Sequence, residues 1–219
     1  MKFDVERIHI IYKNLIKMGK ELDAEKFRAV LEGKGFKKEE RVIPTPTGPL
    51  KEYLLRDPRS LRDLIVVSVK GFVVDSWSFT NALDLTNLAY EVYESILGDA
   101  ISYTLVDIIG LFDATVLISS DVFELVGKLV NSTYVKKLRN AFNRQDLNPF
   151  SAGISIGEPA APNEWIIMNF IPIPDPNAGR RGRRLKVLIE YRGVDSDKGV
   201  EFLHNLSDVI KKAITAIID

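Results

Sequence analysis

Hydrophobic and polar residues alternate along several stretches of the chain in the manner of half-buried β-strands. The clearest stretch is 184–192, in which Leu185, Val187, Ile189 and Tyr191 alternate with residues that are mostly charged. A period of two places one set of side chains against a core and the other on a solvated face, as antiparallel sheets allow. Short connections rich in proline and glycine between such stretches are typical of hairpins. The pattern therefore predicts an antiparallel sheet with one buried face.

The segments 64–97 and 185–218 both end in a stretch whose apolar residues lie three and four positions apart, which is the spacing of one helix face. In each segment a strand-like run leads to an Asp-Ser pair, at 75–76 and at 195–196, and then to the helix. We expect the side-chain oxygens of these pairs to cap the first N–H groups of each helix. Aligned position by position, the two apolar faces consist of Ala82, Leu85, Leu88, Ala89, Val92, Tyr93, Ile96 and Leu97, and of Leu203, Leu206, Val209, Ile210, Ala213, Ile214, Ile217 and Ile218.

The similarity of the two segments extends to their turn residues and predicts an internal repeat. Lys70-Gly71 precedes the first Asp-Ser pair as Arg192-Gly193 precedes the second, and Pro-x-Pro segments lie upstream of both. We interpret the chain as two pseudo-repeats, residues 1–98 and 99–219, that together form one compact unit; a chance match between two generic amphipathic helices is the alternative. Each pseudo-repeat is predicted to run strand, helix, three strands and long helix.

The predicted fold class is therefore α+β, with one antiparallel sheet, long helices on one of its faces and the other face open. A further exposed helix and loop are expected at 132–148, before a strand at 150–156. The N-terminus has charges among its apolar residues, unlike a secretory signal, and no apolar run is long enough to cross a membrane. We therefore expect a cytoplasmic protein without a membrane partner.

A duplicated unit of strand, helix, strands and helix resembles the TATA-binding-protein type of fold. In that fold two pseudo-symmetric halves build one curved sheet, the helices lie on its convex side, and the open face binds. The resemblance implies a binding surface on the open face of this sheet. The DNA-binding members of that fold use paired phenylalanine wedges and a basic concave face. In this sequence Phe72 is the one aromatic residue expected to point outward, with Lys70 and Arg192 nearby.

Three further segments are similar to a sporadically distributed family of uncharacterised prokaryotic proteins of similar length. They are ISYTLVDIIGLFD at 101–113, EWIIMNF at 164–170 and LIEYRGVDSDKGVEFLHNLSDVIKKAI at 188–214. This resemblance implies no particular activity.

The composition excludes several classes of function. Thirty basic and thirty acidic residues give no net charge, so any attraction to nucleic acid must come from a local patch. The absence of cysteine excludes disulfides, thiolate nucleophiles and cysteine-based zinc sites. A single glutamine and three methionines, with plentiful Ile, Val, Lys and Glu, are typical of a thermophilic protein.

The strongest local charge follows a turn rich in proline and glycine, in PDPNAGRRGRRLKV at 174–187. Arginine side chains bind phosphate or carboxylate groups in a bidentate manner. The cluster therefore suits an acidic protein partner, self-association or nucleic acid, and the alternative is a solvated hairpin tip that prevents edge-to-edge aggregation. The predicted anion- or partner-binding residues are Arg180, Arg181, Arg183, Arg184, Lys186 and Arg192, together with Lys70.

Few residues suggest catalysis. The two histidines, His9 and His204, lie far apart in the sequence and belong to no metal-binding motif. Asp107 and Asp113 would share one face of a strand, and paired carboxylates can perform acid–base chemistry. The sequence contains no phosphate-binding loop, nucleophile elbow or dinucleotide-binding fingerprint.

We therefore predict a non-enzymatic binding or interaction protein whose partner is another protein or a second copy of the chain in a dimer. No catalytic residue, metal or cofactor is predicted. The first alternative is a nucleic-acid-binding protein that uses the arginine-rich hairpin 180–192 and the open sheet face. The second alternative is an enzyme that uses Asp107 and Asp113.

Overall fold

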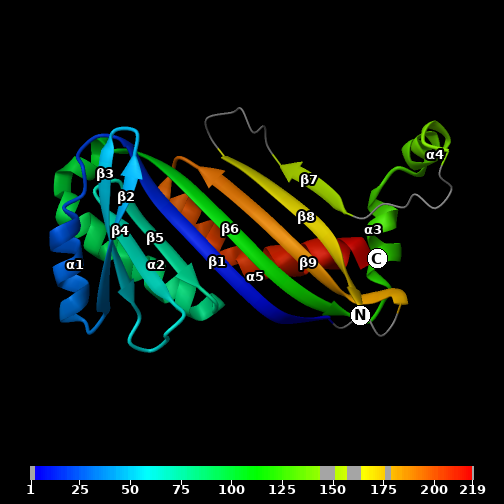
Figure 1. The fold of residues 1–219 in the computed structure, drawn as a ribbon, viewed down its shortest axis with the longest axis horizontal. Coiled ribbons are helices and arrows are strands. Elements are labelled where there is room, and N and C mark those ends of the chain that lie inside the picture. Colours follow the sequence, from blue (N-terminus) through cyan, green and yellow to red (C-terminus); the bar gives the residue numbers. More distant parts are fainter. Residues whose placement is uncertain (1–2, 144–150, 157–163, 176–178, 219) are drawn as a thin grey trace.

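The computed structural model describes residues 3–143, 151–156, 164–175 and 179–218. Its strands form one nine-stranded sheet in the order β2-β3-β4-β5-β1-β6-β9-β8-β7, and every neighbouring pair is antiparallel (Figure 1). The predicted α+β class with an antiparallel sheet is confirmed. The strands are β1 (Phe3–Met18), β2 (Lys37–Thr45), β3 (Gly48–Arg56), β4 (Leu64–Ser68), β5 (Gly71–Ser76), β6 (Leu105–Ile118), β7 (Ala152–Ile156), β8 (Glu164–Asp175) and β9 (Gly179–Gly193).

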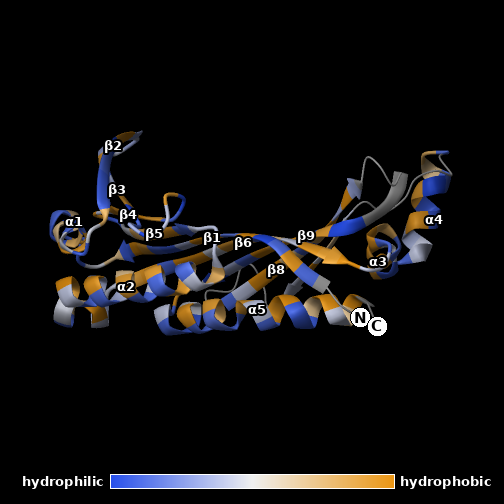
Figure 2. Cartoon of the chain, turned by 90° about the horizontal axis from the view of Figure 1, so that it is seen from below, coloured by the Kyte–Doolittle hydropathy of each residue, from blue (hydrophilic) through white to orange (hydrophobic). Residues whose placement is uncertain are grey.

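The helices lie mainly on one face of this sheet. Figure 2 shows the two long helices, α2 (Phe79–Leu97) and α5 (Ser196–Ile218), running beneath the strands, while the opposite face is uncovered along its middle. The strands β2 and β3 rise above that open face at one end of the sheet, and α4 rises above it at the other. Within the described residues, no helix is long and apolar enough to span a membrane. The remaining helices are α1 (Ala24–Gly33), the 3-10 helix η1 (Gly98–Tyr103), α3 (Val122–Leu129) and α4 (Ser132–Ala141).

The alternation predicted for β9 is confirmed, and it shows which side chains of this strand belong to the hydrophobic core. Leu185, Val187, Ile189 and Tyr191 are all 2 % exposed or less, whereas the charged residues between them face the open side. The apolar stripes of α2 and α5 cover this buried face. Their fully enclosed members include Ala82, Leu85 and Ala89 on α2 and Leu203, Leu206 and Ile214 on α5.

Phe72 does not point outward as expected but lies in the core, where it is 0 % exposed. The strand β5 begins at Gly71, so the alternation of β5 directs Phe72 and Val74 toward the helices. The ring of Phe72 packs edge-on against Tyr90 and Tyr93 of α2, with centroids 5.1 and 5.7 Å apart. It therefore stabilises the helix layer and cannot act as a wedge on the open face.

The caps of the long helices differ from the expectation in one case. Asp75 and Ser76 belong to β5, and the N-cap of α2 is Ser78, whose side chain accepts a hydrogen bond from the N–H of Asn81. At α5 the expected cap is present, because Asp195 accepts hydrogen bonds from the N–H groups of Asp197 and Lys198. The first Asp-Ser pair is thus part of a strand and not of a helix cap.

The structure does not confirm the predicted repeat of strand, helix, three strands and helix. The first half has four strands between α1 and α2, and two helices follow β6 in the second half. Lys70 lies in the turn between β4 and β5, whereas Arg192-Gly193 ends β9, so the two basic-glycine pairs occupy different places in the fold. The exposed helix expected in 132–148 is α4, and residues 144–150 lie outside the described part of the chain.

The strand β1 has different partners along its two edges. It pairs with β6 from Phe3 to Met18, with register shifts between Val5 and Arg7 and near its end. On its other edge it pairs with β5 only from Ile10 to Leu15. The N-terminal part of β1 therefore has no strand partner on that edge among the described residues.

Candidate functional site

The described side chains of the predicted arginine-rich site are spread along β9 and the turn before β5, and most of them form internal ion pairs. Arg184 contacts Glu6 at 2.8 Å, Lys186 contacts Asp113 at 2.8 Å, and Arg192 contacts Glu190 at 3.1 Å. Arg183 is exposed, and Lys70 pairs with Glu21 at 2.9 Å on the turn between β4 and β5. The side chains of Arg180 and Arg181 lie outside the described part of the chain. The described members of the predicted set thus do not converge on one site.

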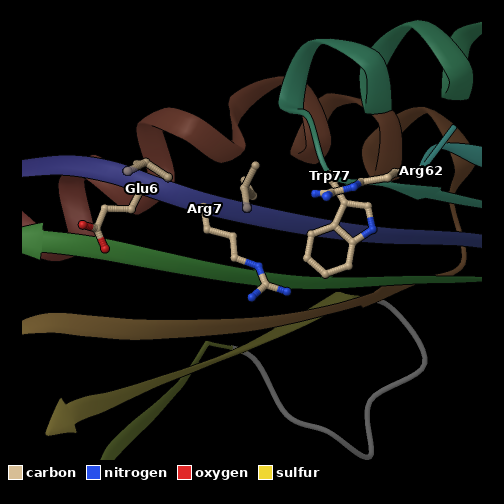
Figure 3. A pocket seen from close by; sticks show the side chains of 6 residues that line it. Glu6, Arg7, Arg62 and Trp77 are labelled. Carbon is tan, nitrogen blue, oxygen red and sulfur yellow. The ribbon is translucent and has the colours of Figure 1, made fainter. Parts of the chain in front are cut away.

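An open cavity of about 810 Å³ lies instead where β5 ends beside β1 (Figure 3). We call it the β1-edge cavity; it is lined by Val5, Glu6, Arg7 and Ile8 of β1, by Arg62 and by Trp77. Side chains of consecutive strand residues point to opposite faces of a sheet. A cavity lined by four consecutive residues therefore extends along the edge of β1 and not over one face alone.

Two guanidinium groups of this cavity have no acidic partner among the described residues. Arg7 places its guanidinium carbon 4.4 Å from the centre of the Trp77 ring, and Arg62 projects beside the same indole (Figure 3). The one acidic lining residue, Glu6, is already paired with Arg184. The β1-edge cavity is therefore a cationic site with an aromatic wall.

His9 supports the aromatic wall from the next open-face position of β1. Its ring stacks on Trp77 with centroids 4.1 Å apart and planes 10° apart. Its Nε2 lies 2.8 Å from Oδ1 of Asp75 on β5. The indole of Trp77 thus packs against the side chains of His9 and Arg7 on β1, and these contacts limit the positions that the ring can adopt.

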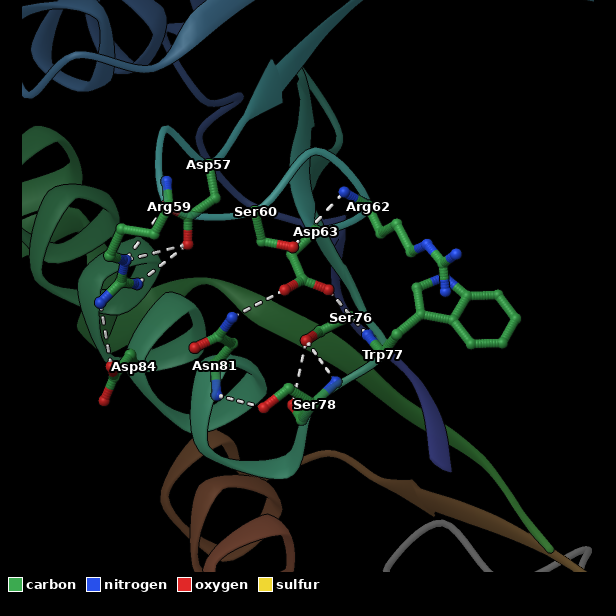
Figure 4. A network of polar contacts seen from close by, with 10 residues as sticks. All are labelled: Asp57, Arg59, Ser60, Arg62, Asp63, Ser76, Trp77, Ser78, Asn81 and Asp84. Atoms are coloured by element: carbon green, nitrogen blue, oxygen red, sulfur yellow. Dashed lines mark hydrogen bonds and ion pairs between the residues drawn. The ribbon is translucent and has the colours of Figure 1, made fainter. Parts of the chain in front are cut away.

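A buried carboxylate fixes the loop that carries Arg62. Asp63 is 2 % exposed and accepts hydrogen bonds from the N–H of Trp77 at 2.7 Å and from Nδ2 of Asn81 at 2.8 Å (Figure 4). Burial alone would raise the pKa of Asp63, but hydrogen bonds from Asn81, Trp77, Ser60 and Ser76 outweigh burial and hold the pKa below its ordinary value. Asp63 therefore ties the loop before β4 to the start of α2, and this connection places Arg62 next to Trp77.

A second buried carboxylate secures the other end of this loop. Asp57 is 2 % exposed and lies 2.9 Å from the guanidinium of Arg59, which also contacts Asp84 of α2 at 3.1 Å (Figure 4). Buried charges are tolerated when they are paired and hydrogen-bonded. The loop 57–63 is thus anchored at both ends, and Arg62 is exposed between the anchors.

The two aspartates considered for catalysis share the open face of β6 but do not meet. They are six residues apart on a continuous strand, which corresponds to roughly 20 Å. Asp107 lies 3.3 Å from the ammonium of Lys17, and Asp113 lies 2.8 Å from that of Lys186. Each carboxylate is therefore part of a separate ion pair.

The histidines are also separate, since His9 is on the open face and His204 is exposed on α5. Within the described ranges, no group of three or more His, Asp or Glu side chains is arranged to hold a metal ion.

The residues of the β1-edge cavity carry no motif that sequence reasoning could have used. Trp77 lies half-buried on the open side of the sheet. Arg7 and Arg62 are isolated in the sequence, and only the path of the loop before β4 brings them together.

Comparison of the chain with protein-family models, with curated proteins and with solved structures yields no match. The resemblances drawn from the sequence therefore stay predictions, and the function must be argued from the geometry of the β1-edge cavity.

Proposed function

We propose that the protein is a non-enzymatic binding protein of the cell interior that holds an acidic protein partner in the β1-edge cavity. The observation that carries this proposal is the presence of two guanidinium groups, Arg7 and Arg62, beside Trp77 and without carboxylate partners among the described residues. Structural arginines on this sheet contact acids of the same chain, as Arg184 does with Glu6. Arg7 and Arg62 contact no acid of the described residues, so their guanidinium groups are available to a ligand.

The chemistry of the site favours carboxylate groups in a partly apolar setting. Guanidinium groups form bidentate hydrogen bonds to carboxylates, and these strengthen when the pair is shielded from water. Val5, Ile8 and the indole of Trp77 supply apolar surface next to the two arginines. A folded partner that presents an acidic side chain next to an aliphatic one satisfies both requirements.

The side-chain contacts of the described residues give less support to the two alternatives, a nucleic-acid-binding protein and an enzyme. A nucleic-acid surface on the hairpin 180–192 would need several free cations, yet among its described side chains Arg184, Lys186 and Arg192 each contact a carboxylate, which leaves Arg183 as the exposed cation. An enzyme that uses Asp107 and Asp113 would need one shared pocket, and these residues lie far apart along β6.

Fluorescence of Trp77 tests the proposal directly. The chain has two tryptophans, so Trp165→Phe leaves Trp77 as the single indole reporter. We expect titration with a short glutamate peptide, and with inorganic pyrophosphate as a compact anion, to change its emission, with an affinity that falls as salt is added. Arg7→Gln combined with Arg62→Gln should abolish the response.

The matched control is Arg41→Gln, because Arg41 is an exposed arginine of β2 that pairs with Glu52. This variant should bind both probes as the parent does. If neither anion changes the Trp77 emission at millimolar concentration, the proposed function is wrong.

A further inference from the structure

The free edge of β1 offers backbone hydrogen-bonding groups to a ligand. At the other end of β1, the N–H of Ile16 donates to the carbonyl of Lys70 on the β5 side. The N–H and C=O groups of every second strand residue point to the same edge, and no register shift interrupts β1 between Arg7 and Ile16. The backbone groups of Ile8 therefore point to the β5 side, where pairing with β5 has ended.

The available length suits a short extended segment. Asp4 to Ile8 span roughly 13 Å of strand, including the register shift between Val5 and Arg7. The segment is limited at one end by Trp77, the residue that follows β5. Natural sheets usually cover or pair such an edge, because it is a template for another strand. Here the same edge is lined by Arg7 and Arg62, so an added strand would meet both cations.

The side chains along the edge define the composition of that strand. Val5 is 47 % exposed, and Ile8 is half-buried next to it. Within the described ranges Arg7 and Arg62 have no acidic partner, while Glu6 is paired with Arg184. The register shift between Val5 and Arg7 puts Val5 and Ile8 on one face of β1, opposite Val116 and Ala114, and Arg7 on the other. A strand in which acidic residues alternate with aliphatic ones would therefore place carboxylates at the arginines and aliphatic groups at Val5 and Ile8.

We propose that an extended acidic segment of a partner protein pairs with β1 over Asp4–Ile8 and extends the sheet by one strand. This inference rests on the proposed function and specifies its mode of binding: main-chain hydrogen bonds to the edge supply affinity, and the two arginines supply selectivity for acids. A second copy of the chain fits this edge less well. It would bring a second Arg7 and a second Arg62 to an edge that already carries these two cations, and like charges repel.

The probe is a seven-residue peptide of alternating glutamate and valine, acetylated and amidated at its ends. In the Trp165→Phe background we expect it to bind about tenfold more tightly than the same peptide with lysine in place of glutamate. On binding, amide exchange at Ile8 should slow by about tenfold or more, because its N–H becomes hydrogen-bonded. The amide of Tyr191, in the interior of the sheet, serves as the internal control and should not change.

Two N-methylated peptides separate strand pairing from simple charge attraction. One carries methyl groups on the glutamate nitrogens and the other on the valine nitrogens. Every second N–H of an added strand faces β1 and the remaining ones face solvent, so one of the two peptides should lose about tenfold or more in affinity and the other should not. This comparison leaves the protein unchanged and does not depend on a variant that folds poorly.

Three outcomes would overturn the inference. Equal affinity for the two N-methylated peptides, or unchanged exchange at Ile8, would leave an anion site without strand pairing, and the proposed function would still stand. Tighter binding of a short single-stranded oligonucleotide than of the acidic peptide would assign the site to nucleic acid. A dimer at micromolar concentration whose formation protects Ile8 and excludes the peptide would assign the edge to a second copy.

Discussion

The backbone N–H of Trp77 donates a 2.7 Å hydrogen bond to Oδ1 of Asp63, a carboxylate that is almost completely buried. Asp63 immediately precedes β4 and Trp77 immediately follows β5, so this bond joins the two open ends of the β4–β5 hairpin. The side chain of Asn81 on α2 donates to the other oxygen at 2.8 Å. One carboxylate thus connects a hairpin, a helix and the aromatic wall of the β1-edge cavity.

Replacing Asp63 by alanine should lower the free energy of unfolding by about 2 kcal/mol, because two partly buried donors lose their acceptor. Urea unfolding at neutral pH measures this loss. The control is Asp208→Ala, which removes an exposed carboxylate of α5 with a long contact to Lys211. In the Trp165→Phe background, the emission of Trp77 should also shift in Asp63→Ala. An unchanged spectrum would contradict the positioning role of Asp63.

Glu25 should make stability depend on pH in the acid range. The hydroxyl of Tyr53 donates to Glu25, and Lys51 and Arg28 add to this effect against the cost of burial, so the pKa of Glu25 falls to about 2. A carboxylate with a lowered folded-state pKa stabilises the protein above its unfolded-state pKa, and this contribution disappears as the pH falls through the folded-state value. The stability lost between about pH 4.5 and pH 2 should be smaller in Glu25→Gln than in the parent.

Urea midpoints measured across this range provide the test. The parent should be the more stable protein at neutral pH, and the difference between parent and variant should shrink as the pH falls and vanish below about pH 2. A constant difference at every pH would show that Glu25 acts through packing and not through its charge.

The first residue of β5, Gly71, should tolerate no side chain. This glycine has φ of +123°, and an added Cβ would lie 2.0 Å from the carbonyl oxygen of Asn14 on β1. Gly71→Ala should therefore combine backbone strain of about 1–3 kcal/mol with a clash against the neighbouring strand. Gly48 has a similar φ of +120°, but a Cβ added there would meet no atom of the described residues within 4 Å, so Gly48→Ala isolates the strain. Thermal unfolding should show the larger loss for Gly71→Ala, and equal losses would contradict the clash.

The buried hydroxyl of Tyr90 should contribute to stability through hydrogen bonding. It lies 2.8 Å from the hydroxyl of Tyr12 and accepts a 2.9 Å hydrogen bond from Nδ2 of Asn14. Tyr90→Phe removes both contacts and leaves polar groups of β1 unsatisfied beneath α2, which should cost about 1–3 kcal/mol. Tyr134→Phe on the exposed helix α4 is the control and should be nearly neutral. Similar unfolding energies for the two variants would contradict this role.

The elements that sequence could predict are those with a local periodic pattern. Leu185, Val187, Ile189 and Tyr191 alternate within nine residues, and such a pattern specifies a half-buried strand wherever the strand lies. The stripes on α2 and α5 were predictable for the same reason. Sequence periodicity could not assign Asp75 and Ser76 to β5. Only Trp77 and Ser78 separate β5 from α2, and such a short connection does not show where the strand ends.

The candidate site could not be predicted, because its members meet only through long-range pairing. Arg7, Arg62 and Trp77 come from three separate segments, and the loop held by Asp57 and Asp63 brings two of them together. The arginine-rich hairpin was conspicuous in the sequence, yet its described cations are largely neutralised by acids from other strands, such as Glu6 and Asp113. A cluster of charges in the sequence indicates free charge only where the fold supplies no counterion.

The pairing of β1 with β6 also sets the order in which the chain can fold on the ribosome. Residues up to Leu97 can form β1, α1, the strands β2 to β5 and α2, but β6 begins only at Leu105. Until β6 has left the ribosome, β1 has one edge wholly unpaired and the other paired, within the described residues, only from Ile10 to Leu15. Contacts between distant segments form slowly, and open strand edges promote aggregation. The nascent first half is therefore the stage of synthesis at which β1 is most open to pairing with other chains.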